Sequence, residues 1–249
     1  MERSTNSRPT DDAFVHDYNR AVELGEAGDI RGAIALTRSL CTRYPTDAAA
    51  WSHLSALLIR QKDYHGALAA AQDALARDPE HSGAHINAGV AARGLGDLET
   101  ARRHIEEAVR IAPSDPDAHL QLGGTLVRLH QWRTAVDAFV RAIAEAHHDE
   151  GRSEFLIERG IDGLTTVKLS TPLAEPLRSL HDGARWLKTG DLVPAYQRLD
   201  RARDAASDDE TVRRAAEALL GHVWRQRALT TPTDPNDDRD QHRDNVLYL

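Results

Sequence analysis

The sequence predicts an all-α protein in which antiparallel helix pairs stack into an α-solenoid with a C-terminal helical extension. Two columns of residues recur with a step of 34, a period typical of helix–turn–helix units that stack on their own copies. Between successive prolines, apolar residues fall at helical spacings of three and four, which gives each helix one apolar face. The columns are Ala33, Ala67, Ala101 and Ala135, and Pro45, Pro79 and Pro113, with His147 in the fourth proline position.

The period defines four complete units, 14–47, 48–81, 82–115 and 116–149. A third column of small residues, Ala21, Ser55, Gly89 and Gly123, lies twelve residues before each alanine. Small side chains in both columns predict close contact between the two helices of a pair. Each second helix is expected to end at the residue before a proline, because the pyrrolidine ring disfavours helical geometry in its predecessor.

These columns resemble the tetratricopeptide repeat family, as in Trp51-x2-Leu54-Ser55-x2-Leu58 and Ala135-x3-Phe139. The resemblance covers residues 14–149 and implies a right-handed superhelix whose first helices line a concave groove. The first unit departs most from the family pattern, with Asp17 in the tryptophan column and Thr37 in the phenylalanine column, as expected of a terminal repeat.

The register breaks after Asp149. We expect an irregular or helical insertion at 150–175, with a helix around 155–161 and a β-like or irregular stretch at 164–172. Residues 176–229 are expected to form a degenerate fifth unit around Ala195 and a capping helix from Thr211 to Leu229.

Residues 1–13 and the acidic tail 230–249 are expected to be disordered. The apolar last five residues of the tail are either a docking motif or a solvated terminus.

The composition excludes several classes of protein. The net charge of -8 opposes nucleic-acid binding, and no apolar run is long enough to span a membrane. The N-terminal residues have no apolar leader, so a cytoplasmic protein is expected, and the excess of arginine over lysine is typical of a bacterial source. Cys41 is the single cysteine, which excludes a disulfide within the chain and a cysteine zinc site; it lies on an apolar helix face and is expected to be inert.

The family resemblance implies which side chains face the groove. The sixth position of each unit holds Asn19, His53, Asn87 and Gln121, a column similar to the asparagine ladder of the O-GlcNAc transferase superhelix. Such groups can pair with the backbone of an extended peptide, or they are simply polar residues facing solvent. Tyr18, Ile86 and Leu120 stand beside them at the fifth position. Arg60, Arg93 and Arg128 occur near the helix ends, where they either favour an acidic ligand or complement the helix dipole.

No catalytic residue, metal or cofactor is expected. His81-x3-His85 spans an inter-repeat turn, and the pair His147-His148 beside Asp149 and Glu150 has no third histidine at a known spacing. The two-carboxylate clamp of chaperone-binding repeats is also missing.

The prediction is therefore an adaptor or scaffold that binds an extended segment of a partner protein in its groove, with self-association left open. One alternative is an accessory subunit or assembly factor of an enzyme that binds through its C-terminal helices, including Trp186 and Trp224. A second alternative is an enzyme with a site around 150–175, which a bound metal or cofactor would favour.

Overall fold

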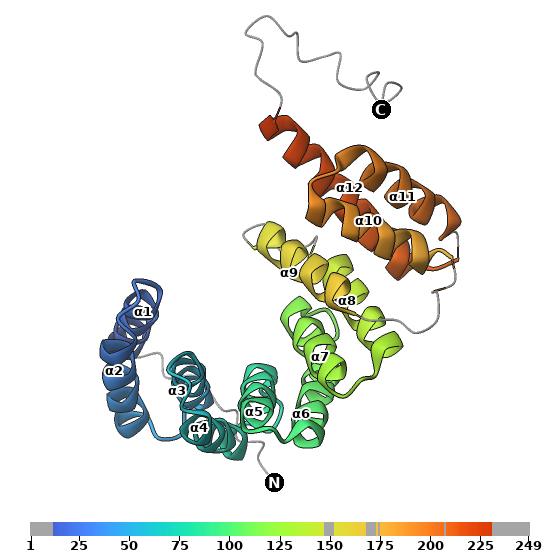
Figure 1. Ribbon diagram of the computed structural model, residues 1–249. Helices are drawn as coiled ribbons and strands as arrows, with labels where there is room; N and C mark the ends of the chain where they lie inside the picture. The colour runs from blue at the N-terminus through green and yellow to red at the C-terminus, as the bar shows by residue number, and fades with distance from the viewer. Residues whose placement is uncertain (1–11, 147–151, 168–172, 174, 207, 231–249) are drawn as a thin grey trace, which may run out of the picture. The chain divides into compact units, whose positions relative to one another are not determined.

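The computed structural model describes residues 12–146, 152–167, 173, 175–206 and 208–230, and all of its regular structure is helical (Figure 1). The chain divides into two compact units, residues 1–114 and 115–249.

Unit 1 contains three antiparallel helix pairs in chain order. The pairs are α1 (Asp12–Glu26) with α2 (Ile30–Arg43), α3 (Ala48–Arg60) with α4 (Tyr64–Arg77), and α5 (Ser82–Leu95) with α6 (Leu98–Ile111). Successive pairs meet through α2 against α3 and α4 against α5, and α3 also contacts α5. The all-α solenoid expected from the 34-residue period is therefore confirmed (Figure 1).

Within each pair, the two columns of small residues bring the helices together. Ala33, Ala67 and Ala101 are fully buried, and so are Ala21 and Ser55 in the facing column. Ser55 Oγ donates a hydrogen bond of 2.7 Å to the carbonyl oxygen of Ala67, so this polar side chain is satisfied inside the pair. The contact that excludes water thus comes from residue size, as the sequence predicted.

The turn inside each pair has a repeated geometry. Gly28, Lys62 and Gly96 lie at the same position of successive units, and their φ values are 88°, 65° and 89°. The next residue in each unit, Asp29, Asp63 or Asp97, caps the second helix by accepting a hydrogen bond from a backbone N–H three residues later. The left-handed residue reverses the chain and the aspartate then starts the next helix.

The part of unit 2 that the structure describes contains six further helices. They are α7 (Pro116–Arg128), α8 (Trp132–Ala146), α9 (Ser153–Thr166), α10 (Leu177–Thr189), α11 (Leu192–Ala205) and α12 (Glu210–Thr230). Helices α7 and α8 form a pair, and so do α10 and α11. Helix α12 packs on α11 and also contacts α8, α9 and α10, so its apolar face closes a core shared by all these helices.

Three expectations about disorder and irregular structure were wrong. Asp12 and Ala13 belong to α1, and Thr230 belongs to α12, although all three residues were expected to be disordered. Leu164–Thr166 form the last turn of α9 instead of an irregular stretch, because Leu164 is fully buried in the core and holds the helix there. The apolar end of the tail and the residues around His147-His148 lie outside the described residues.

No helix in the part of the chain that the structure describes is long and apolar enough to cross a membrane.

Candidate functional site

The first helices of unit 1 lie against one another through the residues expected in the groove. The rings of Tyr18 on α1 and His53 on α3 have centroids 5.2 Å apart. Asn87 on α5 donates hydrogen bonds of 2.9 Å and 3.3 Å from Nδ2 to the carbonyl oxygen and Oγ of Ser52 on α3. Helices α1, α3 and α5 therefore form one surface, which we call the first-helix face: Tyr18, Asn19, His53, Arg60, Ile86, Asn87 and Arg93.

The sixth-position residues of this face differ from one another in what they can offer a ligand. Asn19 is exposed and lines a shallow depression on α1 with His16, Arg20 and Glu23. His53 is half-buried, and its Nε2 makes no hydrogen bond with any residue that the structure describes. The amide nitrogen of Asn87 is committed to the contact with Ser52. Within unit 1 these three groups are not a row of equivalent free amides.

The cation expected near the end of α3 lies beside His53. Arg60 is exposed, and its Nη1 lies 3.4 Å from the position that a Cβ of Gly25 on α1 would take. Burial, and secondarily the charge of Arg60, lower the pKa of His53. The neutral imidazole of His53 and the guanidinium of Arg60 thus stand together where α1 meets α3. Ile86 and Arg93 on α5 are half-buried.

The remaining expected groove residues belong to α7 in unit 2. Leu120 is only 7% exposed and is part of the unit 2 core, so its side chain contributes to packing. Gln121 is half-buried and Arg128 is exposed. The ten residues expected in one groove are therefore divided into two sets, seven in unit 1 and three in unit 2.

The histidines that invited a metal interpretation have other roles. His81 caps α5, because its Nδ1 accepts a hydrogen bond of 3.1 Å from the backbone N–H of Ala84. His85 faces His104, with 3.1 Å between their Nδ1 atoms, and its Nε2 lies 3.1 Å from the carbonyl oxygen of Pro79. His81 and His85 thus point to different partners. His119 is 2% exposed, so its ring lies in the interior of unit 2.

Large apolar side chains are exposed in the described parts of both units, and Val15 on α1 and Leu95 on α5 are those of unit 1. Phe155 on α9, Trp186 on α10 and Val193 on α11 are 51%, 41% and 42% exposed. Trp224 on α12 differs, since its ring packs edge-on against Tyr196 with centroids 5.8 Å apart. Of the two tryptophans expected at a C-terminal interface, Trp186 is the more accessible.

Comparison with known proteins places the repeats in a family. Residues 56–116 match the model of a family described as tetratricopeptide repeat. A tetratricopeptide repeat protein of Thermus thermophilus is 21% identical and superposes with a TM-score of 0.54, covering 83% of this chain and 99% of that one. In the Cut9–Hcn1 hetero-tetramer of the APC/C, the matched chain is 16% identical with a TM-score of 0.51, covering 84% of this chain and 42% of that one.

MamA from Desulfovibrio magneticus is 24% identical, with a TM-score of 0.47 over 54% of this chain and 76% of that one. No curated protein matches the chain. Residues 56–116 thus match the tetratricopeptide repeat family, and the stacked helix pairs have the tetratricopeptide repeat fold. Proteins of this class generally mediate protein–protein interactions and are typically not catalytic.

Proposed function

We propose that the protein is an adaptor that binds an extended, acidic segment of a partner protein on its first-helix face. The proposal is carried by the contact of Tyr18 with His53 and the exposed charge of Arg60 beside it. An aromatic ring, an imidazole and a cation at one helix junction can take up an apolar side chain and a carboxylate of the same segment. Asn19 supplies an exposed amide for the segment's backbone.

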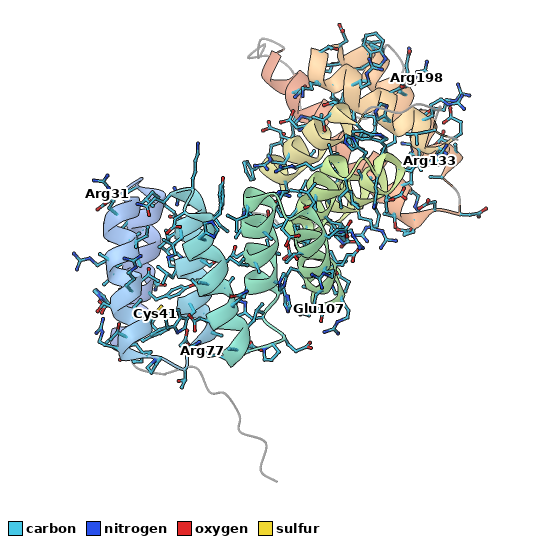
Figure 2. All side chains as sticks on the ribbon, turned by 60° about the horizontal axis from the view of Figure 1, so that its bottom comes forward. Arg31, Cys41, Arg77, Glu107, Arg133 and Arg198 are labelled. Atoms are coloured by element: carbon cyan, nitrogen blue, oxygen red, sulfur yellow. The ribbon has the colours of Figure 1, made fainter. Side chains whose placement is uncertain are left out.

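Site-specific photo-cross-linking tests which surface the partner occupies. A photoreactive residue at Asn19 is expected to cross-link the partner in cells of the source organism. Arg31 is the matched control, because it is exposed on α2 and projects from the opposite helix of the same pair (Figure 2). Equal cross-linking from positions 19 and 31 would exclude a partner confined to the first-helix face.

Charge reversal then tests the acidic segment. A peptide from the cross-linked region of the partner is expected to bind Arg60→Glu about tenfold more weakly than the wild type, because the reversal removes a charge-assisted hydrogen bond and sets a carboxylate against the acidic segment. Arg31→Glu makes the same charge change elsewhere and is expected to leave the affinity unchanged. Full affinity in Arg60→Glu would show that the arginine serves only the helix end.

A second candidate function is that of an accessory subunit that binds an enzyme through its C-terminal helices. The exposed Phe155, Trp186 and Val193 favour it, because large apolar side chains are enriched at stable interfaces. In that case Trp186→Ala is expected to release the partner while Arg60→Glu retains it. The opposite pattern favours the adaptor.

A further inference from the structure

Helices α9 and α12 bring two carboxylates and a buried imidazole together in unit 2. Glu154 and Glu158 are four residues apart on α9, which places them on the same side of that helix. His222 on α12 faces them, and one potential ligand atom from each of the three residues lies within 4.8 Å of the other two. No sequence pattern indicated this cluster, because 64 residues separate Glu158 from His222.

The histidine in this cluster is unusual for a repeat-protein core. His222 is 2% exposed, and its buried Nδ1 has no hydrogen bond of acceptable geometry among the described residues. The closest acidic group is Glu154, whose Oε1 makes an ion-pair contact with this nitrogen. The carboxylate of Glu154 partners this buried nitrogen, and a metal ion that replaced the proton between them would gain Glu158 as a further ligand.

The second ring nitrogen of His222, Nε2, contacts a side chain of its own helix. Its Nε2 lies 2.8 Å from the side-chain amide of Gln226, one turn further along α12. The amide nitrogen of Gln226 faces Nε2 and donates to it, so Nδ1 carries the ring proton toward Glu154. When a metal ion replaces that proton at Nδ1, rotation of the Gln226 amide lets its oxygen accept from Nε2–H. Metal-bound histidines are commonly fixed by such a hydrogen bond on the second nitrogen.

The surroundings leave room for a cation and water. The side chain of Glu154 is 45% exposed and Glu158 is exposed, so solvent reaches the carboxylates while the imidazole closes the inner side. Arg225 donates a 2.6 Å hydrogen bond from Nε to Oε2 of Glu154, which leaves Oε1 directed toward His222. Two carboxylates balance a dication, and the arginine adds one positive charge at the rim.

We propose that Glu154, Glu158 and His222 bind one divalent transition-metal ion, with zinc the favoured metal, and that the ion ties α9 to α12. One imidazole and two carboxylates suit zinc, and water completes its coordination. The cysteine-free donor set and the exposed carboxylates favour a site of moderate affinity. This site is independent of the first-helix face and of the function proposed for it.

Zinc titration of the chelator-treated full-length chain tests the site. Calorimetry is expected to show one saturable zinc ion per chain, and cobalt substitution is expected to give visible d–d absorption of a low-symmetry site. Thermal unfolding is expected to shift upward with added zinc, because the ion binds the folded state. Glu154→Gln and Glu158→Gln are each expected to weaken zinc binding by at least about tenfold, and His222→Gln to abolish it.

Two controls separate this site from the other histidines and carboxylates. Glu217→Gln removes an exposed carboxylate elsewhere on α12, and His104→Gln removes the other close histidine contact; both variants are expected to bind zinc like the wild type. The exposed Glu158→Gln variant is expected to fold even if His222→Gln does not. Absence of saturable zinc binding, or wild-type binding by Glu154→Gln and Glu158→Gln, would overturn the proposal and leave an ion-pair cluster of Glu154, His222 and Arg225.

Discussion

Gly89 on α5 lies against Ile105 on α6 so closely that a Cβ on the glycine would stand 2.4 Å from Ile105 Cγ1. The same pairing recurs sixteen residues apart in unit 2, where a Cβ at Gly123 would stand 2.6 Å from Phe139 and one at Gly183 would stand 2.6 Å from Leu199. In each pair the glycine provides the space that a large apolar side chain fills. The α10–α11 pair is therefore built by the same contact as the repeats.

Gly89→Ala is expected to destabilise the protein by about 1–3 kcal/mol, because the new methyl group overpacks the interface with Ile105. Gly221→Ala is the control. A Cβ at Gly221 would meet only the end of the Arg225 side chain, at 3.5 Å. That helical substitution is expected to be neutral or to stabilise by about 0.5–1 kcal/mol. Urea unfolding measures both, and equal stability of the two variants would contradict the packing argument.

The repeat fold was predictable because its columns are local. Ala33, Ala67 and Ala101 mark the pair contacts directly, and their spacing fixes the stacking order. The contact of Gly183 with Leu199 was also readable in principle, since Gly183 precedes Ala195 by the same twelve residues as in the repeats. The contact of α12 with α8 could not be predicted from the sequence, because no periodic pattern links helices so far apart in the chain.

The site was less predictable than the fold. The family frame placed Tyr18, His53 and Asn87 on neighbouring first helices. In the structure Tyr18 contacts His53, and Asn87 contacts Ser52. The family frame could not show that Asn87 donates to Ser52 or that Leu120 is core, because both depend on how tightly neighbouring helices pack. His104 was missed because nothing in its own helix indicates that it faces His85.

Lys62 holds the turn position that is glycine in two neighbouring units, with φ at 65°. A left-handed conformation costs a residue with a Cβ about 1–2 kcal/mol, and glycine avoids this cost. Glycine also makes the unfolded chain more flexible, which offsets part of the gain in stability. Lys62→Gly is expected to raise the free energy of unfolding by about 0.5 kcal/mol. Gly96→Ala, at φ 89°, makes the reverse change and is expected to lower it by about 1 kcal/mol. A loss of stability in Lys62→Gly would mean that the lysine side chain stabilises the turn.

Cys41 is 4% exposed and lies among the helices of unit 1 (Figure 2). Burial raises the pKa of its thiol to about 11. At pH 8 only about one thiol in a thousand is then ionised, and reagents cannot reach it in the folded protein. Cys41 is expected to react with a disulfide reagent only at the rate of unfolding. Rapid labelling in native buffer, compared with labelling in urea, would show that α2 opens locally.

The facing rings of His85 and His104 make the third helix pair sensitive to acid. The carbonyl oxygen of Pro79 can only accept, so His85 Nε2 carries a proton and its Nδ1 accepts from His104 Nδ1–H. Protonating His104 at Nε2 keeps this hydrogen bond but places a positive charge in a partly buried position beside Arg103. Burial lowers the pKa of His104, and the charges of His85 and Arg103 lower it further. Glu107, whose pKa is lowered mainly by its hydrogen bond from Arg110, is the nearby carboxylate that interacts with His85.

Because the pKa of His104 is lower in the folded state, the unfolded chain binds more protons as the pH falls below about 6.5. The contribution of this pair is therefore full above about pH 6.5 and is lost on acidification toward the folded pKa. His53 and His181, whose pKa values burial also lowers, act in the same direction. His104→Gln is therefore expected to remove only part of the dependence of the free energy of unfolding on pH.

Urea unfolding at about pH 7.5 and about pH 5.5 measures this dependence. His65→Gln, at an exposed histidine of α4, is the control and is expected to keep the wild-type slope. If His104→Gln loses as much stability as the wild type between the two pH values, His104 does not set the acid sensitivity of this helix pair.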